Sequence, residues 1–499
     1  MSKISLTIDD INISAPRGST ILEAASLAGI RIPTLCHLKG QNAKANCRIC
    51  VVHVKGMATL QPACATKAAE GMTVLTNTDA IRESRKMSLE LILSSHSWDC
   101  HHCLRIGNYG IEELDKELCS FCFFCDCVKD GDCELQALAE EYDIRQLFFG
   151  WCGEPLPLDD STGSVVRNPN KCVKCRRCIE VCTNEQTVYA LGVEHRGSRL
   201  QVVPALGKSL VDSPCVKCGK CIDVCPTGAI YAKEQIDEML YTVRLENEKR
   251  TVAQISPGIR GELARLLDMD ERDLDLKRLI SGLRKIGVET VVSEEYAAGA
   301  ADAEAAEKLG KTLREKAGTV ILSNSAPAIE LINKEFPAME KSLVTYPSAE
   351  QKFGQLAKGE WAKRAGVRAE NICAVTLSAN VTYKAEALQP EMRTGGVPSV
   401  DFVLTPQEIA RMLNKTAVNL RKLPQGKYDL FGEARIPSSE ACGALLASPD
   451  GTEGLTELEL HMDGKALKAA VVRGLGGVRR VMEEIQSGAS PYQVVRICS

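Results

Sequence analysis

Residues 172–182 read CVKCRRCIEVC, and residues 215–226 repeat this arrangement as CVKCGKCIDVCP. Each run places three thiolates on one tight loop and a fourth just beyond it, an arrangement that encloses a cubane [4Fe-4S] cluster. In two-cluster ferredoxins the fourth cysteine of each run ligates the cluster of the other run. The spacing therefore predicts two cluster sites in a protein that transfers electrons. One site is Cys172, Cys175, Cys178 and Cys225, and the other is Cys215, Cys218, Cys221 and Cys182.

The cysteines are concentrated in the first half of the chain. Of the 23 cysteines only Cys373, Cys442 and Cys498 lie beyond Cys225, so the other 20 fall between Cys36 and Cys225. A secreted disulfide protein is short and stapled throughout, and zinc sites favour separated Cys-x2-Cys pairs with long spacers. We therefore expect an iron–sulfur protein. Because its thiolates must stay reduced and deprotonated, a reducing, anaerobic cell is implied.

Length and composition exclude several other classes of protein. A chain of 499 residues is too long for one hydrophobic core, so we expect two to four domains. The net charge is −4 and no basic tract is present, which argues against nucleic acid as the main partner. No stretch approaches the ~18 apolar residues of a membrane span. The start, MSKISLTIDD, lacks the apolar core of a signal peptide, so we expect a cytoplasmic protein.

Residues 1–78 carry a third cluster motif. Ile4, Leu6 and Ile8 alternate as in a strand, and a helix is expected from Ser19, as its N-cap, through Ala28. Four cysteines follow as one Cys-x2-Cys pair flanked by two single cysteines, which suits a [2Fe-2S] cluster with two ligands for each iron, although the spacing is not that of plant-type ferredoxins. We expect a β-grasp [2Fe-2S] domain with the ligands Cys36, Cys47, Cys50 and Cys64.

Residues 79–164 hold eight further potential cluster ligands after a helix that is expected over Asp79–Ser94. The segment begins with His96-x3-Cys100-x2-Cys103 and ends at Cys133, and these ends look like two halves of one His/Cys3 motif. A cysteine-rich insertion separates them. We expect one [4Fe-4S] cluster at His96, Cys100, Cys103 and Cys133, and another at Cys119, Cys122, Cys125 and Cys127.

An alternative remains open in this segment. Cys127-x5-Cys133 also fits the motif, so Cys127 could replace Cys103. His101 and His102 are alternative ligands, but histidine is a rare cluster ligand and we expect them to be solvated. The lone Cys152 is expected to pack as a small apolar side chain. The whole chain would then carry one [2Fe-2S] cluster and three to four [4Fe-4S] clusters.

Residues 165–245 contain the two-cluster ferredoxin module and a charged helical linker, and residues 246–499 alternate strands with helices. The expected strands include Thr290–Ser293, Thr319–Ser323, Ile372–Leu377, Phe402–Leu404 and Leu467–Val472; the expected helices include Asp273–Lys285, Ala300–Lys316, Ala326–Phe336 and Pro406–Leu413. This alternation predicts parallel sheets covered on both faces. The fold class is therefore multidomain, α+β in the first half and α/β in the second.

One glycine-rich stretch partly matches the motif of dinucleotide-binding folds: Gly474-x-Gly476-Gly477. The third glycine of Gly-x-Gly-x-x-Gly would stand at position 479, which is Arg479, and no acidic residue follows at the distance of a ribose ligand. We therefore expect a plain strand–helix turn, and no flavin or NAD(P) site in this chain.

These motifs together resemble the catalytic subunit of multi-cluster [FeFe] hydrogenases over nearly the whole chain. In the first half, two of the stretches that carry the resemblance are IPTLC, which ends at Cys36, and CELQALAEEY, which begins at Cys133. In the second half QISPGIRGEL (Gln254–Leu263), DFVLTPQEIARML (Asp401–Leu413) and AAVVRGLGGVRRVMEEIQSG (Ala469–Gly488) carry the resemblance. The first 230 residues are also similar to the large iron–sulfur subunit of NADH dehydrogenase and to formate dehydrogenase partners. The resemblance implies a degenerate hydrogenase-like domain over residues 246–499.

The chain departs from this family at the ligands of its active-site H-cluster. Asn324 and Ser325, in LSNSAPA, stand where the family has two cysteines. Asn380, in SANVTYKAE, stands in place of a third cysteine. Cys498 occupies the position of a methionine that, in the family, comes just before the last Cys-x3-Cys pair. Amide and hydroxyl groups are poor substitutes for thiolates on a soft iron cluster. We therefore expect no H-cluster and no hydrogenase activity, and Cys373, Cys442 and Cys498 are expected to pack as apolar side chains.

A hydrogenase-like chain without an H-cluster resembles the iron–sulfur subunit of Stn-type electron-bifurcating transhydrogenases. This resemblance implies a hetero-oligomer with an NAD(H)-binding flavoprotein, an NADP-binding flavoprotein and ferredoxin as partners, and no complete substrate site in this chain. The alternatives are the electron-transfer subunit of a formate dehydrogenase complex and, in a different class, a redox sensor built on a disabled hydrogenase domain.

Overall fold

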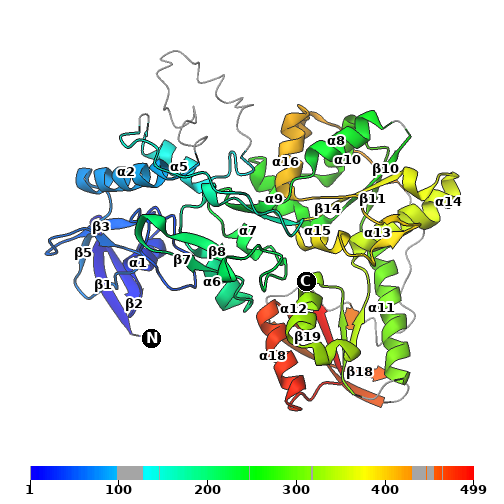
Figure 1. Cartoon of the computed structure of the whole chain (residues 1–499). Helices are drawn as coiled ribbons and strands as arrows, with labels where there is room; N and C mark the ends of the chain where they lie inside the picture. Colours follow the sequence, from blue (N-terminus) through cyan, green and yellow to red (C-terminus); the bar gives the residue numbers. More distant parts are fainter. Residues whose placement is uncertain are drawn as a thin grey trace.

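The computed structural model describes residues 2–97, 127–144, 147–246, 248–315, 318–429, 445–446, 454–462 and 465–498. The N-terminal sheet lies on one side of the molecule, and two α/β units lie on the other (Figure 1). The cysteine-rich module with the 172–182 and 215–226 runs lies between them. Among the described residues no helix is both long and apolar enough to cross a membrane.

The N-terminal unit is a five-stranded sheet in the order β2-β1-β5-β3-β4 with one helix against it. Its elements are β1 Lys3–Ile8, β2 Ile11–Pro16, α1 Ile21–Leu27, β3 Val51–Val54, β4 Gln61–Pro62 and β5 Thr73–Leu75. As expected, Ile4, Leu6 and Ile8 alternate into the core. The N-cap of α1 is Thr20 rather than Ser19, because the Thr20 hydroxyl and the Glu23 carboxylate form a reciprocal capping box. The fold is the expected 2Fe-2S domain type.

Two helices connect this sheet to the cysteine-rich module. They are α2 Asp79–Ser94, which has the expected bounds, and α5 Glu134–Glu141. Leu89 and Leu93 of α2 pack against Leu135 and Leu138 of α5 in one buried cluster. The module is thereby fixed against the N-terminal sheet by apolar burial.

The cysteine-rich module over 165–232 is built from two short antiparallel strand pairs and two helical turns. They are β6 Val165–Arg167 with β9 Ile230–Ala232, β7 Leu191–Glu194 with β8 Gln201–Pro204, and α6 Arg177–Glu180 and α7 Lys220–Asp223. Each helical turn follows one of the cysteine loops. A π-helical turn, η3 Val181–Glu185, continues α6 and carries the fourth cysteine of the first run.

The first α/β unit has a fully parallel sheet in the order β11-β10-β14-β17, with buried apolar clusters on both faces. Its strands are β10 Arg250–Ile255, β11 Thr290–Ser293, β14 Ile372–Leu377 and β17 Phe402–Leu404. Its helices are α8 Ile236–Leu245, α9 Arg260–Leu266, α10 Leu276–Ile286, α13 Ala349–Leu356, α14 Ala362–Ala365, α15 Thr382–Ala387 and α16 Pro406–Lys415.

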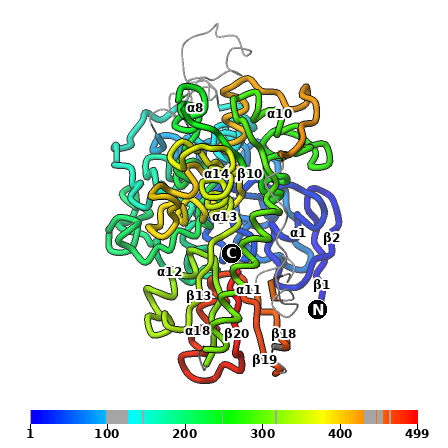
Figure 2. Tube along the Cα trace, turned by 90° about the vertical axis from the view of Figure 1, so that its right-hand side faces the viewer, coloured from blue at the N-terminus to red at the C-terminus, as the bar shows by residue number. Residues whose placement is uncertain are grey.

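The second α/β unit has the sheet order β13-β12-β20-β19-β18, parallel except for the antiparallel pair β18/β19. Its strands are β12 Val320–Ser323, β13 Leu343–Thr345, β18 Gly454–Met462, β19 Lys465–Arg473 and β20 Val494–Cys498. Its helices are α11 Glu295–Glu315, α12 Ala326–Glu335 and α18 Leu475–Gln486. This unit lies at one end of the molecule in both views, and the long α11 runs from it toward α13 of the first unit (Figures 1 and 2). The expected parallel architecture is therefore confirmed, and β18 adds an antiparallel edge.

The smaller elements connect these units. A two-stranded hairpin is formed by β15 Arg393–Thr394 and β16 Val397–Pro398, and a second π-helical turn is η8 Ala357–Trp361. The 3-10 turns are η2 Pro169–Lys171, η4 Gly197–Arg199, η5 Ala205–Gly207, η6 Pro257–Ile259, η7 Pro337–Ser342, η9 Ala369–Asn371 and η10 Leu420–Lys422.

The cysteine-rich module packs directly on the second α/β unit. Val188 and Val216 of the module share one buried cluster with residues of α12, α18 and β20. Arg479 of α18 donates to the carbonyl and hydroxyl of Thr187 and forms an ion pair with Glu335 of α12. Gly474, at φ +78°, makes the turn from β19 into α18. The glycine-rich stretch is thus a strand–helix turn, as expected.

Glu386 of α15 is a buried carboxyl group that makes stability depend on pH. One of its oxygens accepts a hydrogen bond from the Ser348 amide, and the other has no partner among the described residues. Burial raises the pKa of Glu386 from 4.5 to about 7. The folded state therefore retains a proton that the unfolded chain loses between these values, so stability is lost as the pH rises from 4.5 to 7.

We expect Glu386→Gln to unfold at the same temperature as the wild type below pH 4.5 and at a higher temperature above pH 7. The pKa difference corresponds to about 3 kcal/mol of unfolding free energy at high pH. Anaerobic thermal unfolding at several pH values measures this effect. Glu307→Gln, at an exposed glutamate of α11, is the matched control. Identical pH profiles for Glu386→Gln and the wild type would contradict the prediction.

Candidate iron–sulfur sites and the adjoining cavity

The four cysteines of the N-terminal unit lie together around the loop before β3. The Cys47 thiol donates to Cys36 and lowers the pKa of Cys36 to about 6, and the Cys50 thiol donates to Cys64. The pKa values of Cys47 and Cys50 are raised because each holds the shared proton and is buried. Backbone amides also point at these sulfurs, as they do around iron–sulfur clusters: those of Asn46, Ile49, Leu35 and Ala45. The donor set therefore fits a [2Fe-2S] cluster.

The two cysteine loops of the central module have the same backbone conformation. In each loop the residue before the second cysteine and the residue after it have positive φ. The four residues are Lys174 at 56°, Arg176 at 65°, Lys217 at 60° and Gly219 at 75°. This repeated left-handed conformation coils each loop, and backbone amides donate to its first two sulfurs.

Each loop encloses a cavity whose fourth thiol comes from the other run. One cavity is lined by Cys172, Cys175, Cys178 and Cys225, and the other by Cys215, Cys218, Cys221 and Cys182. Burial raises the pKa of Cys172 and Cys215 to about 11, and that of Cys175 and Cys218 to about 12. A bound metal displaces such protons. The structure thus brings together the two expected sets of four thiols, and their chemistry fits two cubane clusters.

His96 and Cys133 lie on either side of the segment that the structure does not describe. His96 is buried, and its carbonyl accepts a hydrogen bond of 2.8 Å from the Trp151 indole. Burial lowers the pKa of His96 to about 3, which keeps the imidazole in the neutral form that binds metals. Cys133 is the N-cap residue of α5 and interacts electrostatically with Cys127 and Cys225. Cys127 is therefore near Cys133, as the alternative pairing requires.

The other ligands expected for this segment lie outside the described residues, so their assignment stays a prediction. They are Cys100, Cys103, Cys119, Cys122 and Cys125.

The unassigned cysteines differ in their surroundings. Cys373 is buried in β14, as expected, and Cys442 lies outside the described residues. The expectation for Cys152 was wrong: its side chain is exposed, because the chain passes over the surface and is held there by a backbone hydrogen bond to Ser94. Cys498 is only half-buried, because β20 ends at the wall of a cavity.

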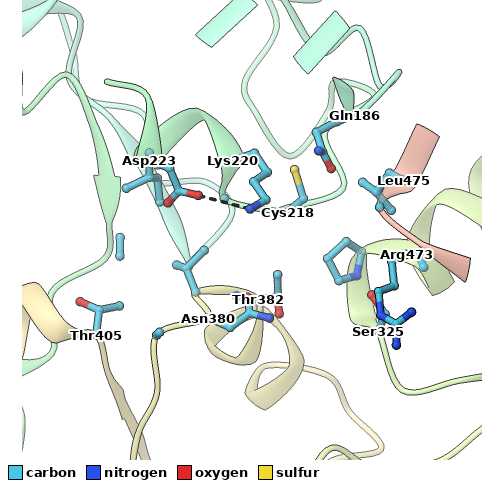
Figure 3. A pocket seen from close by; sticks show the side chains of 18 of the residues that line it. Gln186, Cys218, Lys220, Asp223, Ser325, Asn380, Thr382, Thr405, Arg473 and Leu475 are labelled. Atoms are coloured by element: carbon cyan, nitrogen blue, oxygen red, sulfur yellow. Dashed lines mark hydrogen bonds and ion pairs between the residues drawn. The ribbon is translucent and has the colours of Figure 1, made fainter. Parts of the chain in front are cut away.

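That cavity, of about 400 Å³, lies between the central module and the two α/β units. Cys218 lines it from the module, Asn380 from the loop before α15, and Ser325 from the loop before α12 (Figure 3). Two of the three residues that the family resemblance placed at H-cluster cysteines, Ser325 and Asn380, therefore converge from separate segments on one space beside a predicted cluster, whereas Asn324 does not line it. Gln186 and Arg473 also line it. Gln186 lies in no motif of the sequence, and Arg473 lies in the stretch Ala469–Gly488 without having been singled out as a site residue.

Arg177 connects the N-terminal sites with the central module. Its guanidinium is buried and makes two hydrogen bonds, of 2.6 and 2.9 Å, to the Glu134 carboxylate at the start of α5. It also interacts electrostatically with the thiols of Cys36 and Cys175. One fixed cation therefore acts on both predicted cluster sites.

Three family descriptions match successive parts of the chain. "2Fe-2S iron-sulfur cluster binding domain" matches residues 1–79, and "4Fe-4S dicluster domain" matches residues 171–230. "Iron only hydrogenase large subunit, C-terminal domain" matches residues 249–499. The matches follow the three parts of the fold described above.

Known proteins resemble the chain over different lengths. The NADP-reducing hydrogenase subunit HndD of Solidesulfovibrio fructosivorans is 30% identical over 99% of this chain and 86% of its own. Iron hydrogenase 1 of Clostridium pasteurianum is 24% identical with the same coverage. The mitochondrial NADH-ubiquinone oxidoreductase 78 kDa subunit of Candida albicans is 28% identical over 40% of this chain and 25% of its own.

Among solved structures, the apo form of [FeFe]-hydrogenase HydA1 from Chlamydomonas reinhardtii aligns over 53% of this chain and 81% of its own, with 18% identity and a TM-score of 0.46. The sequence relatives and the domain matches are more specific than this structural likeness. By its relationship to HndD over 99% of this chain and the match over residues 249–499, the chain belongs to the family of iron-only hydrogenase large subunits with N-terminal 2Fe-2S and 4Fe-4S ferredoxin domains.

Proposed function

We propose that this chain is the electron-transfer subunit of an NADH- and ferredoxin-dependent NADP transhydrogenase complex and has no hydrogenase activity. The observation that carries the proposal is the contrast between two adjoining sites. Two sets of four thiols, each of them buried or half-buried, line cavities in the central module. The neighbouring cavity presents Ser325 and Asn380 at the positions where thiolates would be needed.

The cysteine sets hold the clusters of the relay in this proposal. Cys36, Cys47, Cys50 and Cys64 hold a [2Fe-2S] cluster, and the two crossed sets in the central module hold [4Fe-4S] clusters. His96, Cys133 and the cysteines between them hold the remaining one or two. When bound, such clusters supply one-electron transfer at potentials set by their surroundings.

The residues at the cavity do not fit an H-cluster. Beside Cys218, which belongs to a crossed thiol set, the described lining contains one thiol, Cys498. A hydroxyl and an amide occupy the other positions, and neither supplies a thiolate to iron. The C-terminal domain then serves as a scaffold that docks the central module, in keeping with the apolar cluster that they share.

The relatives support a pyridine-nucleotide-linked complex. HndD is named as a subunit of an NADP-reducing hydrogenase, and a shorter relative is the gamma subunit of the NAD-reducing hydrogenase HoxS. We extend this to an NAD(H)-binding flavoprotein, an NADP-binding flavoprotein and ferredoxin as partners in the cytoplasm.

Anaerobic purification of the native complex tests this function. We expect two flavoprotein subunits to co-purify, electron transfer to depend on NADH, ferredoxin and NADP, and no hydrogen to be produced or consumed. Hydrogen turnover by the pure complex would overturn the loss of the H-cluster. A molybdopterin subunit in place of the flavoproteins would instead identify the chain as the electron-transfer subunit of a formate dehydrogenase.

Arg177→Met should shift the reduction potentials of two clusters, those at Cys36 and at Cys175. Removing a nearby positive charge disfavours the reduced state; an effect of about 1 kcal/mol corresponds to about −40 mV for one electron. Redox titration followed by electron paramagnetic resonance measures both potentials. Arg199→Met, at an exposed arginine of the same module, should leave both unchanged. A shift at neither cluster in Arg177→Met would contradict the prediction.

A further inference from the structure

The cavity beside Cys218 is large enough for a small molecule and has one side rich in hydrogen-bond donors. Its volume of about 400 Å³ lies in the range of small-molecule sites in proteins. Figure 3 shows Gln186, Leu475, Arg473 and Ser325 along one side, and Asp223 on the opposite side. The two sides therefore differ in the charge that they favour.

Two helices begin at the donor-rich side. The ten-residue α12 follows Ser325, whose side chain accepts no hydrogen bond from the helix, and its second residue, Pro327, has no amide hydrogen. The twelve-residue α18 follows Gly474, which has no side chain to cap it. The first amides of a helix have no partner inside it, and its dipole places partial positive charge there. Two such ends lining one cavity provide donors and a potential that suit an anion.

Gln186 supplies an independent indication of a ligand. It comes from the turn after η3, is only 3% exposed, and lines both this cavity and the adjoining cavity of the second thiol set. Its amide nitrogen has no hydrogen-bond partner among the described residues. A buried donor without a partner costs free energy, and an acceptor in either of the two cavities that Gln186 lines would remove that cost.

The charged residues at the cavity are arranged consistently with this. Arg473, at the end of β19, lies on the donor-rich side (Figure 3). On the opposite side the ammonium of Lys220 is 3.6 Å from the Asp223 carboxylate, and Glu262 lines the cavity as a second carboxylate. An anion would therefore be favoured near the two helix ends rather than near the carboxylates.

We propose that this cavity binds a small oxyanion, as a phosphate or a carboxylate group, between the N-termini of α12 and α18 and the amide of Gln186. This inference rests on the proposed absence of an H-cluster, because the same space could not hold both. It gives the C-terminal domain a ligand-binding role that its docking function does not require.

The test is anaerobic calorimetry and thermal unfolding of the holo-chain with inorganic phosphate in one arm and acetate in the other, at constant ionic strength. We expect one of them to bind and to raise the unfolding temperature. Gln186→Met removes the donor at similar volume and should weaken binding about tenfold, as expected for a hydrogen bond to a charged group. Ser325→Asp places a carboxylate at the start of α12, which favours the helix but should abolish binding.

Thr78→Asp is the control, because it also replaces an N-cap hydroxyl by a carboxylate, at α2, far along the chain from this cavity. Binding by wild type and Thr78→Asp but not by Ser325→Asp would support the site, and the arm that responds identifies the group. Binding by neither probe, or equal binding by Ser325→Asp, would overturn it. Iron measured in the same samples separates the two proposals, since iron in excess of the ferredoxin-type clusters contradicts the loss of the H-cluster instead.

Discussion

Cys182→Ala should remove about four iron atoms from the cluster held by the second cysteine run and leave the cluster of its own run intact. The reason is the crossed arrangement of the central module. Cys182 lines the cavity of Cys215, Cys218 and Cys221, whereas Cys225 lines the cavity of the first run. An anaerobic iron determination with electron paramagnetic resonance of the reduced protein measures the loss.

Double variants make this prediction decisive. Cys182→Ala combined with Cys221→Ala should lose no more iron than either single variant, because both thiols belong to one site. Cys182→Ala combined with Cys178→Ala should lose two clusters. Cys373→Ala is the control, because this thiol is buried in β14 away from both runs and should cost no iron. The reverse outcome of the two double variants would assign Cys182 to its own run.

The thiol sets were predictable because ligand spacing is a local property of the chain. The same two left-handed positions recur in both loops, so a short repeated sequence fixes the geometry of both. The strands Thr290–Ser293, Ile372–Leu377 and Phe402–Leu404 were equally predictable, since each is a short apolar run with defined ends.

Elements that depend on distant partners were harder to predict. The expected strands did not include β10, although it lies in the middle of the first sheet. They also missed β20, which pairs with β12 and β19 from the end of the chain. Gln186 gave no signal in the sequence, because its place at the cavity depends on a distant part of the chain. Arg479 of α18 bonds to the adjacent Thr187, although the two residues are 292 positions apart in the sequence.

Exposure was the other property that the sequence did not reveal. A lone cysteine is most often a small buried side chain, and Cys373 follows this rule. Cys152 does not, because it lies in an irregular segment that passes over the surface. Cys498 is at the end of a buried strand, but the strand ends at a cavity. Burial in such places is decided by tertiary packing, which residue type alone does not report.

Lys384→Met should lower the free energy of unfolding by about 3–5 kcal/mol, the cost of breaking a buried ion pair. The side chains of Lys384 and Glu408 are 1% and 3% exposed, and their charged atoms are 3.0 Å apart. Lys384 also donates to the carbonyl of Val403 and to the side chain of Gln235. Its replacement leaves the Glu408 carboxylate without a cation in a place that water does not reach.

The exposed pair of Lys415 and Asp237 is the control, because Lys415 is on α16, the helix of Glu408. Lys415→Met should change the unfolding free energy by less than about 1 kcal/mol. Urea unfolding under anaerobic conditions compares the variants, and hydrogen exchange of α15 and α16 peptides locates the change. If Lys384→Met is as stable as Lys415→Met, the ion pair does not hold these helices together.

The double variant Lys384→Met, Glu408→Gln distinguishes stability from positioning. Replacing both charges of a buried pair is often nearly neutral, and glutamine retains an oxygen for the capping box with Thr405. We therefore expect the double variant to regain most of the lost stability. The pair joins the starts of α15 and α16, where Asn380, Thr382 and Thr405 line the cavity beside Cys218. If stability returns but oxyanion binding does not, the pair serves to position that wall of the cavity; if both return, apolar packing alone suffices to shape it.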